Sequence, residues 1–154
     1  MKQKKEIDFP FKYAEKCLYN FKANAARLKI LREKLSELDK SMSMHGQSYE
    51  PLNNNGGSND NSPVAIRALK IASLEDEIST LSLRTTPIAD LIKDLSGAEV
   101  LAGSRNAELM QIMNLFYFGQ NSADAVAYEL NISRAKFYRL REQLVKLAIK
   151  YLGV

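Results

Sequence analysis

Six residues near the C-terminus have the chemistry of a polyanion-binding surface. They are Ser133, Arg134, Lys136, Tyr138, Arg139 and Arg141. Arginine can bridge two acceptors on guanine or contact a phosphate, lysine supplies a point charge, and a tyrosine hydroxyl can donate to a phosphate. We expect Arg134, Lys136 and Tyr138 to contact base edges of double-stranded DNA. Ser133, Arg139 and Arg141 are expected to contact its backbone.

The charge of the chain is concentrated where these residues lie. The net charge of the 154 residues is only +4, but residues 133–154 hold six Lys/Arg against one Asp/Glu, and residues 64–132 hold five against nine. The positive charge therefore peaks where a duplex would bind. Charge alone gives equal weight to a solvated basic tail.

The spacing of small, turn and apolar residues predicts a helix-turn-helix around these cations. Ser122 and Ser133 are suited to cap two successive helices, and Asn131 tolerates the left-handed backbone of a tight turn. Ala127, four residues before the turn, is small enough to let the helices cross closely, and Phe137 lies on the inward face of the second helix. An ordinary helical hairpin with a basic surface is the alternative, but it does not require these features to coincide.

A supporting helix is expected to precede the motif. It follows a Ser104 cap and ends at Gly119. Its apolar face would consist of Leu109, Ile112, Met113 and Phe116.

The N-terminal half predicts two long amphipathic helices. From Phe11 to about Lys40 the apolar residues recur at spacings of three and four, as in a coiled coil, with Asn24 in one slot of the seam. A second helix is expected after Ser62-Pro63, an N-cap followed by proline at the first helical position. The two predicted faces are Ala14, Cys17, Phe21, Leu28, Leu31, Leu35 and Leu38, and Ala68, Ile71, Leu74, Ile78 and Leu81.

These segments predict an all-α protein with two domains. Residues 1–96 would form a helical hairpin or oligomerisation region, with a flexible connector at 41–62 rich in Asn, Ser and Gly. Residues 104–154 would form the helix-turn-helix domain, separated from the first by the glycine-containing stretch 96–104. The pairing of the long helices, within one chain or between chains, is left open. Pro87, after Thr85-Thr86, predicts a break with Thr86 as a new N-cap, or a strong kink.

The sequence offers little for catalysis, and we expect a non-enzymatic protein without cofactor or metal. His45 has no His or Cys near it, and Cys17 falls on an apolar stripe as a small core residue. Glu75, Asp76 and Glu77 are adjacent, so on a helix they point to different faces and form no catalytic pair. No membrane span or secretory leader is predicted, and we expect a cytoplasmic protein.

The stretch Ala127–Glu142, AYELNISRAKFYRLRE, resembles the sigma-factor-like helix-turn-helix of the RinA/ArpU phage transcriptional regulators. The layout is also similar, because members of that family have an N-terminal helical pair around a Gly/Ser/Asn-rich connector, here 53–63. The resemblance implies an activator of late genes of phages or prophages in Gram-positive bacteria. Its sigma-factor analogy implies host RNA polymerase as a partner.

Two functions follow as hypotheses. The first is a sequence-specific DNA-binding transcription regulator, whose N-terminal helices form a homo-oligomer, with a dimer favoured. The alternative is a small terminase subunit, which would hold viral DNA for packaging in a ring of subunits.

Overall fold

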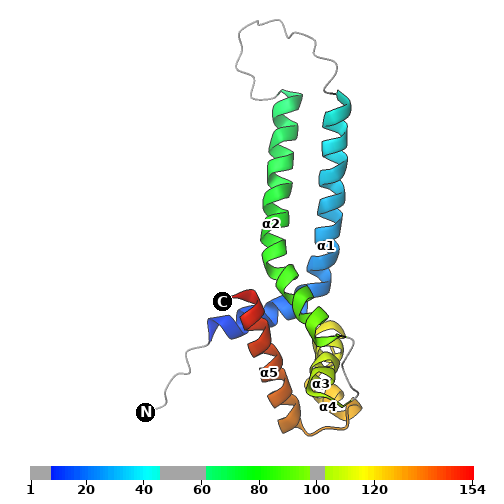
Figure 1. Ribbon diagram of the computed structural model, residues 1–154, viewed down its shortest axis with the longest axis vertical. Helices are drawn as coiled ribbons and strands as arrows, with labels where there is room; N and C mark the ends of the chain where they lie inside the picture. Colours follow the sequence, from blue (N-terminus) through cyan, green and yellow to red (C-terminus); the bar gives the residue numbers. More distant parts are fainter. Residues whose placement is uncertain (1–7, 46–61, 98–102) are drawn as a thin grey trace, which may run out of the picture. The chain divides into compact units, whose positions relative to one another are not determined.

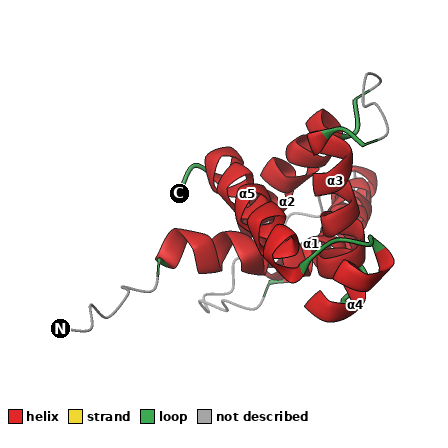
Figure 2. Ribbon diagram, turned by 90° about the horizontal axis from the view of Figure 1, so that it is seen from below, coloured by secondary structure: helices red, strands yellow, loops and turns green. Residues whose placement is uncertain are grey.

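The computed structural model describes residues 8–45, 62–97 and 103–154, and over these residues it is all-α (Figures 1 and 2). The predicted fold class is therefore confirmed. The elements are α1 (Phe9–His45), α2 (Pro63–Leu95), α3 (Arg105–Ile112), the π-helix η1 (Met113–Phe118), α4 (Ala123–Glu129) and α5 (Arg134–Leu152).

Two compact units make up the chain. One combines residues 1–25 with residues 83–154, and the other is residues 26–82. The start of α1 and the end of α2 therefore belong with the C-terminal helices, whereas the sequence assigned them to an N-terminal domain. The prediction that residues 1–96 and 104–154 form two separate domains stays a prediction.

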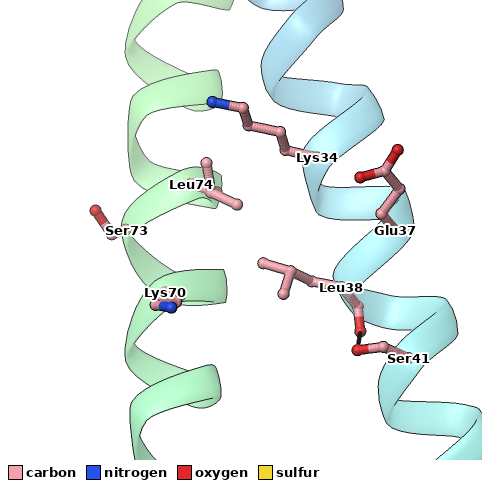
Figure 3. A pocket seen from close by; sticks show the side chains of 7 residues that line it. All are labelled: Lys34, Glu37, Leu38, Ser41, Lys70, Ser73 and Leu74. Carbon is pink, nitrogen blue, oxygen red and sulfur yellow. Dashed lines mark hydrogen bonds between the residues drawn. The ribbon is translucent and has the colours of Figure 1, made fainter.

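The unit of residues 26–82 is an antiparallel pair of helical segments from one chain. Arg27 near its start forms an ion pair with Glu77, with Nη2 and Oε1 3.0 Å apart, while Leu38 further along α1 lies beside Leu74 (Figure 3). The pairing that the sequence left open is therefore within the chain. Of the predicted seam residues in this unit, Leu28 and Leu31 are buried, whereas Leu35 and Leu38 are half-buried.

The predicted apolar face of α2 is wrong at Ala68, its first residue, and fits at the other four positions. Ala68 is exposed, whereas Ile71, Leu74, Ile78 and Leu81 are half-buried. At 100° per residue, the six positions from Ala68 to Leu74 turn Ala68 about 120° away from Leu74. The predicted N-cap is confirmed, because the Ser62 hydroxyl accepts from the amide of Ala65 at 3.1 Å.

Pro87 does not interrupt α2. The helix runs from Pro63 to Leu95, so the predicted break with a new N-cap at Thr86 is wrong. Proline removes one backbone hydrogen bond, but its neighbours Thr85, Ile88 and Leu91 are buried in the unit of residues 1–25 and 83–154. Burial of these side chains stabilises the helical turn despite the missing donor.

The predicted connector begins later than expected. Helix α1 continues to His45, so residues 41–45 are helical, and residues 46–61 lie outside the described residues. The predicted boundary 96–104 is described only at its two ends, where Ser104 caps α3 by accepting from the amide of Ala107.

The core of the unit formed by residues 1–25 and 83–154 draws on every helix within it. Cys17 is buried here, which confirms its predicted role as a small core residue. The buried side chains of this core are Ala14, Cys17, Leu18, Ile88, Leu91, Leu95, Leu109, Ile112, Met113, Phe116, Tyr117, Val126, Ala127, Phe137, Leu140, Leu144, Val145 and Ala148.

The supporting helix ends at Gly119, as predicted, but its last turn is a π-helix. The amide of Gly119 donates to the carbonyl of Asn114 at 2.8 Å, five residues earlier. A β-carbon at Gly119 would lie 2.8 Å from the carbonyl oxygen of Leu115 and 3.0 Å from that of Asn114. Position 119 therefore requires glycine, because any β-carbon there would be too close to the carbonyl oxygens of the π-helical turn.

Replacing Gly119 with alanine is expected to reduce the free energy of unfolding by about 1–3 kcal/mol, because backbone oxygens would have to move. Gly97→Ala is the matched control, since the nearest atom to its added β-carbon is 3.6 Å away. Urea unfolding followed by circular dichroism measures both. Equal stability of the two variants would contradict the close-approach argument.

Candidate nucleic-acid interface

Helices α4 and α5 form the predicted helix-turn-helix. The Ser122 hydroxyl accepts from the amide of Ala125 at 3.2 Å, and the Ser133 hydroxyl accepts from that of Lys136 at 3.1 Å. Asn131 has a φ of 53°, the left-handed conformation that the tight turn requires. Both caps and the turn residue are therefore confirmed.

Burial of small and aromatic side chains fixes the crossing of the two helices. Ala127 is buried, and its carbonyl accepts from the amide of Ile132 at 3.0 Å. Phe137 is fully buried and packs edge-on against Phe116, with ring centroids 5.1 Å apart. The inward face of α5 continues through Leu140 and Leu144, as the spacing predicted.

The opposite face at the start of α5 is exposed. It carries Arg134, Ala135, Tyr138 and Arg139, at helix positions one, two, five and six. At 100° per residue these positions share one side of the helix. Arg139 forms no ion pair with any residue in the described part of the chain.

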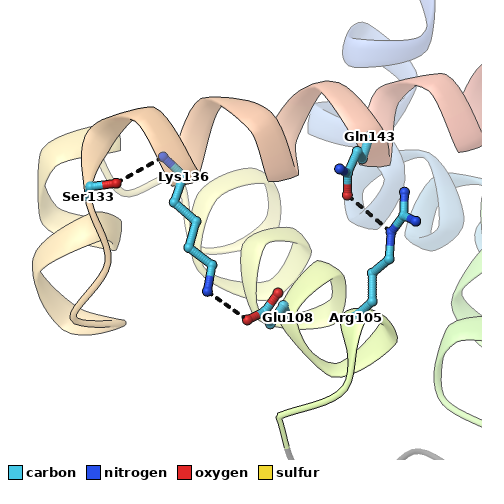
Figure 4. Close-up of polar contacts among 5 residues, drawn as sticks. All are labelled: Arg105, Glu108, Ser133, Lys136 and Gln143. Carbon is cyan, nitrogen blue, oxygen red and sulfur yellow. Dashed lines mark hydrogen bonds and ion pairs between the residues drawn. The ribbon is translucent and has the colours of Figure 1, made fainter.

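Three of the four predicted cations are held by carboxylates, and two of these, Arg134 and Lys136, pair with the neighbouring helices α4 and α3. Arg134 lies 2.9 Å from Asp124 on α4, and both side chains are about two-thirds exposed. Lys136 is turned toward α3, where its Nζ lies 3.0 Å from the Oε1 of Glu108 (Figure 4). Exposed pairs of this kind contribute little to stability, so Arg134 can exchange its carboxylate for another anion at small cost.

Arg141, which the sequence predicted to contact the DNA backbone, is instead turned toward α1, and its contact with DNA stays a prediction. Its Nε lies 2.7 Å from the Oε1 of Glu15 at the start of α1, and its guanidinium lies over the Phe116 ring at 5.6 Å. The side chains of Arg141 and Glu15 are 26% and 16% exposed. The charge is therefore directed into the unit, where a carboxylate from α1 compensates it.

The Glu15 carboxylate also accepts from the buried hydroxyl of Tyr117, at 2.9 Å. Burial, together with the negative charge of Glu15, raises the pKa of Tyr117. The phenol therefore stays protonated and donates its hydrogen bond throughout the ordinary pH range. One carboxylate thus connects α1 to both η1 and α5.

Sequence reasoning missed Arg105, at the start of α3. Its Nε donates to the Oε1 of Gln143 on α5 at 3.1 Å (Figure 4). Arg105 lies about thirty residues before the predicted cations, and only the crossing of α3 and α5 brings it beside them. Glu15 was missed for the same reason, since it is still more distant in sequence.

Residues 73–152, just over half of the chain, match the family model described as "Protein of unknown function (DUF1492)", and the chain belongs to that family. The matched residues include the whole helix-turn-helix. No curated protein and no solved structure matches the chain.

Neither a membrane-spanning helix nor a metal site is present among the described residues. No helix among them is long and apolar enough to cross a membrane. No group of three or more His, Cys, Asp or Glu side chains in the described ranges could hold a metal ion.

Replacing Glu15 with glutamine is expected to reduce the free energy of unfolding by about 3 kcal/mol, because it leaves the half-buried Arg141 charge unpaired. Asp124→Asn, which removes the exposed partner of Arg134, is the matched control and should change it by less than about 1 kcal/mol. Chemical denaturation measures both. A Glu15→Gln variant as stable as Asp124→Asn would mean that the carboxylate is not a structural tie.

Proposed function

We propose that the chain is a sequence-specific double-stranded DNA-binding protein that regulates transcription, with α5 as its recognition helix. The observation that carries this proposal is the exposed face of α5, presented by a helix-turn-helix whose caps, turn and buried side chains all fit the motif. The N-terminal part of such a helix enters the major groove.

The orientation of α5 favours a different division of contacts from the one the sequence suggested. Arg139 and Tyr138 lie on the exposed face and are suited to base edges, together with Arg134. Lys136 lies on the flank toward α3 and is better suited to the DNA backbone. Ser133 caps the helix, and Arg141 acts by holding α5 in place.

The regulatory part of the proposal is supported by the RinA/ArpU resemblance, which favours an activator of phage or prophage late genes in the bacterial cytoplasm. Binding DNA requires no catalysis, and we propose no enzymatic activity. A contact with host RNA polymerase stays a prediction.

We also propose a homodimer formed through residues 26–82. Among the described residues of this unit, Ile30, Val64, Ile66 and Leu69 are exposed, and only Leu28 and Leu31 are buried. A groove of about 530 Å³ between its helices contains Leu38 and Leu74, with Lys34, Lys70 and Glu37 among its charged lining residues (Figure 3). Side chains of both signs allow two copies to place lysine against glutamate. Two recognition helices would then contact two half-sites.

The DNA-binding proposal predicts that a defined sequence is enriched from a random duplex library by the full chain. Arg139→Gln should weaken binding to that sequence by about 1–3 kcal/mol and relax the preference at one base pair, because a bidentate base contact is lost. Equilibrium binding to the enriched duplex and to single-base variants measures both effects.

Lys93→Gln is the matched control, because it removes an exposed positive charge from α2 rather than from α5. It should leave the base preference unchanged. Absence of any enriched sequence, or equal discrimination by the Arg139→Gln and wild-type proteins, would contradict the proposal.

The dimer proposal predicts twice the chain mass in sedimentation equilibrium at micromolar concentration. Leu69→Glu, which places a charge on the exposed apolar surface, should shift the protein toward monomer without changing its helicity. A wild-type monomer would contradict the dimer. A ring of many subunits would instead favour the packaging hypothesis.

A further inference from the structure

A groove of about 300 Å³ lies between α3 and α5, beside the exposed face of the recognition helix. Its lining is dominated by long polar side chains from both helices (Figure 4 labels four of them). The lining residues are Arg105, Glu108, Lys136, Arg139, Leu140 and Gln143.

The charges in this groove are only partly compensated. Glu108 neutralises Lys136 across 3.0 Å, but Arg105 is held by the neutral amide oxygen of Gln143 at 3.1 Å. Arg139 forms no ion pair with the described residues. The groove therefore holds one acid–lysine pair together with two guanidinium groups, those of Arg105 and Arg139, that have no carboxylate partner among the described residues.

We infer that this groove binds a phosphodiester of the DNA backbone, next to the base pairs that the exposed face of α5 contacts. This inference rests on the proposed function, and it adds Arg105 and Gln143 to the interface. Arg139 belongs to both the groove and the exposed face, so a duplex lying along α5 would bring its backbone to Arg105.

The chemistry of the lining suits a phosphate better than a base. Guanidinium groups and an ammonium are donors without acceptor capacity, and phosphate oxygens are acceptors only. The Gln143 amide accepts from Arg105 through Oε1, so its nitrogen can donate to the same anion. Lys136, Arg139 and Gln143 recur along one flank of α5 over about 10 Å, parallel to the helix axis.

Glu108 is the one acidic residue among the described lining residues of the groove, and its charge opposes the binding of an anion there. In the free protein it holds Lys136 beside α3. A phosphate in the groove would be repelled by this carboxylate and would compete with it for the Lys136 ammonium. Glu108 therefore limits the affinity for DNA. Removing the charge of Glu108 should strengthen DNA binding, whereas removing the charge of Arg105 should weaken it.

The test uses the full-length chain and two duplexes, one mixed-sequence and one enriched by selection, titrated over a range of salt concentrations. Arg105→Gln should weaken binding to both duplexes by the same factor, roughly fivefold. It should also reduce the slope of log K against log salt by about one. Glu108→Gln should tighten binding to both duplexes and leave base preference unchanged. Lys93→Gln is the matched control and should leave the slope as in the wild type.

The outcomes separate the two proposals. Unchanged salt slope in Arg105→Gln, or weaker binding by a folded Glu108→Gln variant, would overturn the inference while Arg139→Gln still supports the recognition helix. Failure of the wild-type chain to bind either duplex would overturn the proposed function itself. Circular dichroism of each variant establishes that it is folded.

Discussion

The rotation of α5 depends on the burial of Phe137. This ring is fully buried against Phe116, and the same face of the helix continues through Leu144 and Ala148. Because an α-helix has one rotation that buries such a stripe, the residues opposite it must face solvent. The exposure of Arg139, and with it the proposed recognition surface, follows from this packing.

The unit that holds α5 in place is built from both ends of the chain. Residues 1–25 supply Glu15, which accepts hydrogen bonds from Tyr117 and Arg141. A carboxylate that ties α1 to two other elements is costly to bury unless it is paired, and here its partners satisfy it. The start of α1 is thus a structural part of the unit that presents the proposed DNA-binding surface.

The sequence predicted the local features well and the distant contacts poorly. The Ser122 and Ser133 caps and the Asn131 turn follow from the chemistry of single residues, so the helix-turn-helix could be recognised without a structure. Arg141 was misplaced because its partner Glu15 lies 126 positions away, and no periodicity indicates such a contact. The break at Pro87, one of two predicted outcomes, does not occur, because tertiary burial outweighs the local preference of proline to end a helix.

In the proposed complex, DNA contacts the exposed face of α5 and its flank toward α3. The most direct test is an amide NMR titration of the full-length chain with the enriched duplex. We expect the largest shifts in residues 133–143 and at Arg105, with small shifts in residues 26–82. Shifts concentrated in residues 26–82, with α5 unaffected, would contradict this mode of binding.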